Sequence, residues 1–388
     1  MVYFIYFVIM VTFIDTFSQL PIMSPYAQSL GATPFLIGIT VGIYSFSNII
    51  GNILAGYWID KDGAKRVLYI ALALTGGIVL AYVWAGSPTQ LIVVRFLHGL
   101  SGGFLVPAAF TFIANRSNDN KKGKSMALSG AVVGLAAIIG PAFGGIVTGT
   151  IGIRWVFITI GILMIVTAPL VFFILPNTHA KMSRRIDNKE TGKSVLDLLK
   201  VMPLFYAYLG SFCLMFSQGV LAYMLPLKIE SLRYGSEVSG MLLSVFAMTA
   251  ILIFVLPTNR LYDRFAYEYT MTLGLAVLGV SLLLLGTAVS LTYMFLIMML
   301  YGVGFALIFP TINALIAYYT TSLERGKAFG LFYAFFSLGV VAGSTVTGAL
   351  SVSADGAFLI GAGVLIVTSF IILFLVRKRM KVSATYHE

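Results

Sequence analysis

Three ionisable side chains lie inside long apolar stretches of the sequence, where a charge is costly. Asp15 lies in the first stretch, and Arg95 and His98 lie one helical turn apart in a later one. Ionisable groups at such depth are rare and usually functional. A carboxyl group beside a guanidinium group can bind and release a proton as its surroundings change. We therefore predict that Asp15, Arg95 and His98 couple proton movement, with His98 relaying protons or hydrogen-bonding a substrate.

Arg95 has two further interpretations. It would stabilise the charged form of Asp15, or it would bind an anionic group of a substrate. A static Asp15–Arg95 pair that only fixes the register of two helices is the alternative, and for His98 the alternative is packing.

Other polar and aromatic side chains lie at or near the middle of the apolar stretches. They are predicted to face a substrate cavity, and they are Gln19, Tyr44, Asn48, Gln218, Tyr223, Tyr301, Asn313 and Tyr333.

The composition excludes a water-soluble protein. Hydrophobic residues make up 59% of the 388 residues and charged residues 10%, against about 45–50% and about 25% in soluble domains. The sequence shows no catalytic constellation and no nucleotide-binding loop, so neither an enzyme nor a cofactor is predicted. The single Cys213 permits no internal disulfide and no cysteine metal site. The net charge of +11 lies in short loops, which argues against nucleic-acid binding.

A membrane-spanning helix needs about 20 apolar residues, and the sequence provides twelve such stretches. They predict an all-α membrane protein with spans at 2–24, 35–57, 66–86, 89–114, 125–148, 153–175, 203–226, 237–257, 270–289, 291–318, 327–351 and 356–376.

The positions of Lys and Arg predict the orientation of these spans. Of 25 such residues, 21 lie in one alternate set of loops and the tail, and only Arg154, Lys228 and Arg233 lie in the other set. Cytoplasmic loops carry the excess of Lys and Arg. Both termini and the polar stretch 176–202 are therefore predicted to be cytoplasmic, in a protein of the plasma membrane.

The two halves of the chain repeat each other. A shift of 203 residues superposes Gly and Pro as well as charged positions: Asp60 on Asp263, Lys61 on Arg264, Gly99 on Gly302, Pro107 on Pro310 and Gly140 on Gly343. Parallel six-span repeats are a known transporter architecture, with the substrate site between the repeats. We predict an N-terminal six-helix bundle (1–175), a cytoplasmic linker (176–202), a C-terminal six-helix bundle (203–376) and a cytoplasmic tail (377–388).

A charged loop separates the second and third predicted spans. Its marked positions are Gly56, Asp60, Lys61, Gly63, Lys65 and Arg66. The stretch 56–66 resembles the signature loop of the major facilitator superfamily, although Ala64 replaces a basic residue and Trp58 a leucine. The resemblance implies a gating loop that locks the outward-facing state. A loop that only maintains orientation is the alternative.

Two more motifs extend the resemblance along the chain. Arg95, His98 and Gly99 resemble a motif of span four in the same family, with His98 in place of the usual glutamine. In span five, Gly140, Pro141, Gly144 and Gly145 resemble the motif typical of its antiporters, and the Pro is present only in the first half. This pattern implies export, although a plain packing kink gives the same sequence.

These features predict a proton-coupled secondary transporter that exports small amphiphilic molecules by alternating access. Its expected partners are the substrate, protons and membrane lipid, and one chain should suffice as a monomer. The alternative is a dedicated exporter of one metabolite, such as a metallophore, siderophore or sugar. A membrane enzyme and a channel fit the sequence less well.

Overall fold

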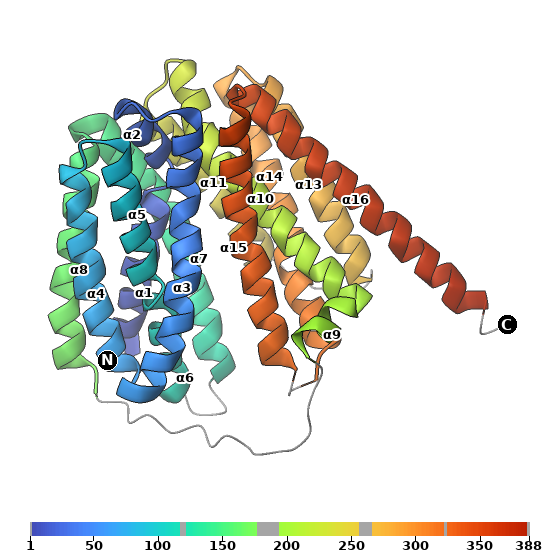
Figure 1. Cartoon of the computed structure of the whole chain (residues 1–388), viewed down its shortest axis with the longest axis horizontal. Helices are drawn as coiled ribbons and strands as arrows, with labels where there is room; N and C mark the ends of the chain where they lie inside the picture. Colours follow the sequence, from blue (N-terminus) through green and yellow to red (C-terminus); the bar gives the residue numbers. More distant parts are fainter. Residues whose placement is uncertain (1, 117–121, 177–193, 256–265, 322–323, 386–388) are drawn as a thin grey trace. The chain divides into compact units, whose positions relative to one another are not determined.

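The structure is a computed structural model, and it describes residues 2–116, 122–176, 194–255, 266–321 and 324–385. Every regular element in these ranges is helical (Figure 1). The helices are α1 (Val2–Ser18), α2 (Met23–Ser29), α3 (Pro34–Asp62), α4 (Ala64–Ala81), η1 (Tyr82–Trp84), α5 (Pro88–Gly102), α6 (Leu105–Arg116), α7 (Lys122–Ile151), α8 (Ile153–Ile174), α9 (Val195–Lys200), α10 (Met202–Ser231), α11 (Ser236–Val255), α13 (Tyr267–Thr287), α14 (Leu291–Tyr318), α15 (Arg325–Leu350) and α16 (Ala354–Thr385).

The predicted membrane spans are confirmed as helices. In the part of the chain that the structure describes, 11 helical segments are long and apolar enough to cross a membrane, and α1 with the bent α2 makes up to 12. The predicted spans 153–175 and 291–318 agree closely with α8 and α14. The chain is thus an all-α integral membrane protein.

The first predicted span, 2–24, is wrong in one respect. Helix α1 ends at Ser18, and α2 begins at Met23 after a bend of 46°. Pro21 lies within this break. Its ring clashes with the carbonyl group four residues earlier and it lacks an N–H group, so a continuous helix is strongly disfavoured there. The break leaves Gln19 just beyond the end of α1.

Short polar caps begin several helices. The Thr33 side chain accepts a hydrogen bond from the Leu36 N–H group before Pro34, and Ser87 caps α5 in the same way before Pro88. A proline suits the first helical position because its missing N–H group would have no partner there. These caps set where α3 and α5 begin.

The cap of the short helix α9 is also polar. Ser194 Oγ donates to Asp197 Oδ2 at 2.7 Å and accepts from its N–H group, and Lys200 lies 3.3 Å from Asp197 Oδ1. The Ser194 hydroxyl first, and Lys200 second, lower the pKa of the Asp197 carboxyl group. Most of the linker that precedes α9, residues 177–193, lies outside the described residues, so the predicted domain boundary stays a prediction.

The helices form two compact units. The first comprises Met1–Ile186, Leu225–Ser244 and Gly348–Ser351, and the second comprises Asp187–Met224, Val245–Thr347 and Val352–Glu388. In the first unit the main pairings are α4 with α8, α1 with α7 and α3 with α5; in the second, α13 packs on α14 and α16. The glycines Gly76 and Gly161 let α4 and α8 approach closely, since a Cβ on either would lie under 3.0 Å from the other's carbonyl oxygen.

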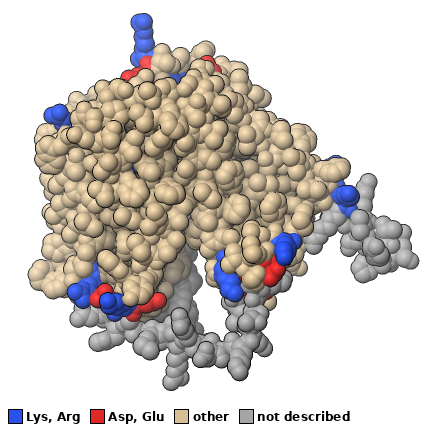
Figure 2. All heavy atoms as spheres, in the orientation of Figure 1, with Lys and Arg blue, Asp and Glu red and all other residues tan. Residues whose placement is uncertain are grey.

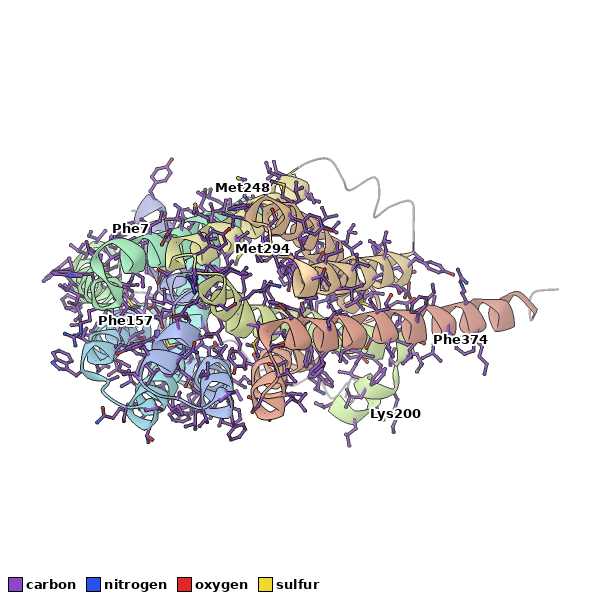
Figure 3. All side chains as sticks on the ribbon, turned by 90° about the horizontal axis from the view of Figure 1, so that it is seen from above. Phe7, Phe157, Lys200, Met248, Met294 and Phe374 are labelled. Atoms are coloured by element: carbon purple, nitrogen blue, oxygen red, sulfur yellow. The ribbon has the colours of Figure 1, made fainter. Side chains whose placement is uncertain are left out.

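The outer surfaces of the helices are apolar. Figure 2 shows Lys, Arg, Asp and Glu at the ends of the helices, with a wide uncharged band between them. On α16, Phe374 points away from the ribbon (Figure 3) and is 66% exposed. Large exposed apolar side chains of this kind suit contact with lipid rather than with water.

Candidate functional site

Asp15 is the carboxylate of a buried polar cluster in the first unit. It lies on α1 and is 1% exposed. His98 Nε2 on α5 lies 2.9 Å from its Oδ2 atom, and Gln19 Nε2 donates to its Oδ1 atom at 2.8 Å. Both carboxylate oxygens therefore have a partner, as a charge away from water requires.

Arg95 is the cation of the same cluster, and it is 5% exposed. Its Nη1 atom donates to Gln19 Oε1 and, at 3.5 Å, to the Tyr82 hydroxyl group. Its guanidinium carbon lies 4.5 Å from the centre of the Tyr44 ring, a cation–π contact. The Nε atom of Arg95 is buried without a hydrogen-bond partner.

The expected ion pair between Asp15 and Arg95 is wrong in its partner. The carboxylate of Asp15 pairs with His98, and Arg95 reaches it only through Gln19. Arg95 and His98 lie three residues apart on α5. The rotation of α5 about its own axis therefore decides which of the two side chains meets Asp15 on α1. The three predicted residues do come together, but in a different order.

Tyr82 is a member of the cluster that the sequence did not reveal. Its hydroxyl group lies 3.1 Å from His98 Nδ1, and its side chain is fully buried. The ring stacks on Phe157 at 4.6 Å, and Tyr26 Oη donates to the Tyr82 carbonyl group at 2.8 Å. Tyr82 is one of 20 tyrosines and stands at the end of an apolar stretch, so no local signal marks it.

Five side chains therefore form a closed ring of hydrogen bonds, which we call the polar ring. Its members are Asp15, His98, Tyr82, Arg95 and Gln19. Tyr44 borders the ring: its hydroxyl group lies 3.1 Å from Thr16 Oγ1, and its aromatic ring meets His98 edge-on. One carboxylate and one guanidinium group balance each other, so a proton added to this ring creates a net positive charge.

Glycines allow α5, which carries Arg95 and His98, to pack closely against α3. A Cβ atom at Gly99 would collide with the Tyr44 carbonyl oxygen, and one at Gly103 would lie 2.6 Å from the Asn48 carbonyl oxygen. Asn48 Nδ2 also donates to the Gly99 carbonyl group at 3.3 Å. This contact places Asn48, which was predicted to face a cavity, between two helices.

The predicted antiporter motif packs against α1, which carries Asp15. A Cβ atom at Gly140 would lie 2.7 Å from Phe17 Cβ, and one at Gly144 would collide with the Ser18 carbonyl oxygen. Gly145 faces the segment that begins α11, where Ser236 Oγ donates to its carbonyl group at 3.0 Å. The motif therefore sets how closely α7 approaches α1.

Pro141, within the same motif, lacks the N–H group that would bond to the carbonyl group of Ala137, four residues earlier. Ser244 Oγ donates at 2.6 Å to the carbonyl group of the next residue, Ile138.

The predicted gating loop lies at the turn between α3 and α4. Gly63 has φ 82°, which an L side chain rarely adopts, and it both ends α3 and begins α4. Asp60 and Lys61 are exposed, and the ion pair of this loop joins Arg66 to Asp62 at 3.1 Å. Asp60, another of the marked positions of the loop, makes no such pair within the described residues.

Two further features of the loop follow. Lys65 Nζ lies 5.3 Å from the centre of the Phe172 ring, and a Cβ atom at Gly56 would meet open space. The repeated copy, with Asp263 and Arg264, lies outside the described residues.

The remaining predicted cavity residues all belong to the second unit. Tyr301 is fully buried and its hydroxyl group lies 2.7 Å from Ser217 Oγ, whereas Asn313 Nδ2 donates at 2.7 Å to its own helix, at Phe309. Tyr333 is 61% exposed. Gln218 is half-buried and Tyr223 is buried. No three His, Cys, Asp or Glu side chains among the described residues come together to hold a metal ion.

Known proteins resemble the chain along nearly its whole length. It is 25% identical over 345 residues to an uncharacterized MFS-type transporter of Methanocaldococcus jannaschii, covering 85% of this chain and 86% of that protein. It is 27% identical over 345 residues to the multi-drug resistance efflux pump PmrA of Streptococcus pneumoniae, covering 84% of each. The fold matches a crystal structure of a mutant of the nucleoside transporter NupG with a TM-score of 0.83 and 15% identity, covering 96% of this chain and 98% of that one.

The family model named Major Facilitator Superfamily matches residues 5–248 and 207–386, which together take in both repeats. Members of this family are transporters of small molecules and not enzymes, in agreement with the sequence prediction. The chain belongs to the major facilitator superfamily.

Proposed function

We propose that this transporter exports small amphiphilic molecules in exchange for protons, by alternating access. The observation that carries the proposal is the polar ring, in which the carboxylate of Asp15 and the imidazole of His98 are 2.9 Å apart and buried. Such a pair can hold one extra proton without leaving a carboxylate unpaired.

Export is supported by two further findings. Relatives such as PmrA are named as multi-drug efflux pumps, and the antiporter motif packs on the same helix that carries Asp15. A proton bound at Asp15 changes the charge next to Ser18, where Gly144 meets α1. Protonation and helix packing are thereby brought to one place, as coupled transport requires.

The wider interpretation follows from topology. We propose that both termini and the 176–202 linker face the cytoplasm in a plasma-membrane protein that works as a monomer. The loop between α3 and α4 serves as its cytoplasmic gate, with the Arg66–Asp62 pair bracing the start of α4. The second unit is rich in aromatic and Met side chains, among them Met248 and Met294 (Figure 3). Flexible Met side chains suit varied apolar substrates.

Replacing Asp15 with asparagine tests the proposal. In vesicles with an imposed pH gradient, Asp15→Asn should lose uphill transport of amphiphilic dyes but keep downhill substrate flow, because asparagine cannot take up a proton. The matched control is Asp197→Asn, which changes an exposed carboxylate of α9. Uphill, pH-driven transport that survives in Asp15→Asn would show that another group carries the proton.

A further inference from the structure

The hydrogen bonds of the polar ring have one permitted direction. A guanidinium group can only donate and an ionised carboxylate can only accept. Arg95 is therefore the source of the ring, and Asp15 is its end. One arm runs from Arg95 through Gln19 to Asp15, and the other runs from Arg95 through Tyr82 and His98 to Asp15.

This direction determines the tautomer of His98 before protonation. Because Asp15 Oδ2 accepts, His98 Nε2 carries the hydrogen, and the neutral ring then has a bare Nδ1 atom. Tyr82 must donate its hydroxyl hydrogen to this Nδ1 atom, 3.1 Å away. Its oxygen is left to accept from Arg95 Nη1 at 3.5 Å.

An added proton cannot enter through the Gln19 arm. A proton on Asp15 Oδ1 would face the amide hydrogens of Gln19. If the amide turned over to accept it, those hydrogens would face Arg95 instead, and two donors would meet. Gln19 therefore has no orientation that serves a protonated Asp15 Oδ1 and Arg95 at once.

The Tyr82 arm can take the proton, and it does so in the same way wherever the charge settles. If His98 becomes an imidazolium, both of its nitrogens carry hydrogen. If the Nε2 hydrogen moves to Asp15 Oδ2, the neutral imidazole accepts through Nε2 and carries its hydrogen on Nδ1. In both arrangements one proton has been added, and Nδ1 has become a donor toward Tyr82.

We propose that Tyr82 is the positioning residue of the proton site, a hydroxyl group that donates to His98 when the site is empty and accepts from it when the site is loaded. This rests on the proposed proton coupling. A phenolic oxygen has two lone pairs and can accept from His98 and Arg95 together. Its own hydrogen must then turn away from Nδ1, so the hydrogen bond between Tyr82 and His98 reverses its direction when the proton is bound, while the bond from Arg95 is kept.

Other ionisable groups near His98 do not offer this exchange. Tyr44 on α3 presents its ring, and its hydroxyl group is engaged with Thr16 on α1. The described part of α6 up to Asn115 has no ionisable side chain. Those of α4 lie in its first two turns, roughly 20 Å along the helix from Tyr82.

Nitrogen-15 NMR of the histidine side chain tests the proposal directly. The chain has three histidines, so His179→Gln with His387→Gln leaves His98 as the only labelled imidazole. At alkaline pH the spectrum should show a bare Nδ1 and a protonated Nε2 atom. A hydrogen on Nδ1 at alkaline pH would overturn the proposal, and this measurement needs no change at Tyr82.

Tyr82→Phe in the same background supplies the second measurement. With the charge on His98, the loaded site loses a charge-assisted hydrogen bond whereas the empty site loses a neutral one, so the titration midpoint should fall by roughly one pH unit. The pH profile of proton-driven transport should move the same way. Tyr69→Phe is the control, because Tyr69 lies on α4 and makes a ring contact with Phe172 outside the polar ring.

The outcomes separate the two proposals. An unchanged midpoint in Tyr82→Phe, with a lower transport rate only, would leave Tyr82 a packing residue and the transport proposal intact. A wild-type protein that ignores the pH gradient would refute proton coupling, while the NMR result would still decide the role of Tyr82.

Discussion

Arg95 illustrates how one residue can serve a buried site without meeting its opposite charge. Its guanidinium group is held by Gln19, Tyr82 and the face of Tyr44, all of them neutral. The amide of Gln19 connects the two charged groups of the polar ring: its oxygen accepts from Arg95, and its nitrogen donates to Asp15. The sequence predicted only that Gln19 faces a substrate cavity, whereas the structure shows that it connects Arg95 to Asp15.

Removing the amide should destabilise the protein. Gln19→Leu would leave one hydrogen-bonding group of Arg95 and one of Asp15 buried without that partner, at a cost of about 2 kcal/mol or more. Thermal unfolding in detergent should show a clearly lower midpoint. Gln28→Leu, at an exposed position of α2, is the control and should unfold close to the wild type. Equal midpoints for the two variants would mean that water replaces the Gln19 amide.

At the scale of helices, close backbone contacts determine where the ring members stand. Gly99 and Gly103 bring α5 onto α3, and Gly140 and Gly144 bring α7 onto α1. Each contact lies within about one and a half turns of a member of the polar ring, and Gly99 directly follows His98. Small residues are the usual means by which membrane helices approach, since lipid offers no hydrophobic driving force for association.

Gly144→Ala should therefore disturb the site from a distance. Its Cβ atom would collide with the Ser18 carbonyl oxygen and push α1 away from α7, which shifts Asp15 relative to His98 on α5. Displacements of about 1 Å can lower activity on the order of a hundredfold, so we expect transport to fall by roughly tenfold to a hundredfold.

Gly130→Ala supplies the control on the same helix, because a Cβ atom there meets nothing within 4 Å. This variant should transport like the wild type, as measured by dye efflux at matched protein levels. Similar losses in both variants would point to helix flexibility instead of packing.

Over the whole molecule, each unit builds its packing in the same manner. Gly140 packs on the backbone of α1 at Phe17 and Ser18, and Gly343 packs on the backbone of α10 at Phe216 and Val220. The shift of 203 residues that relates Gly140 to Gly343 also relates Phe17 to Val220. The repeat seen in the sequence is therefore a repeat of helix contacts. The polar ring belongs to the first unit.

The proposed orientation of the molecule can be tested on α10. Its 30 residues span about 45 Å, so Lys200, just before it, and Ser231, at its end, should lie on opposite sides of the membrane. The single Cys213 is buried and can first be replaced by serine. An impermeant maleimide added to intact cells should label Ser231→Cys but label Lys200→Cys only after permeabilisation. The reverse pattern would invert the proposed topology.

The sequence by itself determined the class of the protein, its spans and the residues that matter. Hydropathy and the placement of Lys and Arg are local properties, so they locate α8 or α14 to within a few residues, and isolated charges in apolar stretches singled out Asp15, Arg95 and His98. Only the tertiary structure decided which of these side chains form hydrogen bonds with one another. Hydrogen bonds between helices depend on the rotation and closeness of each helix, which arise from contacts such as Gly144 on Ser18. For that reason the sequence did not predict that His98, and not Arg95, is the partner of Asp15, or that Tyr82 belongs to the site.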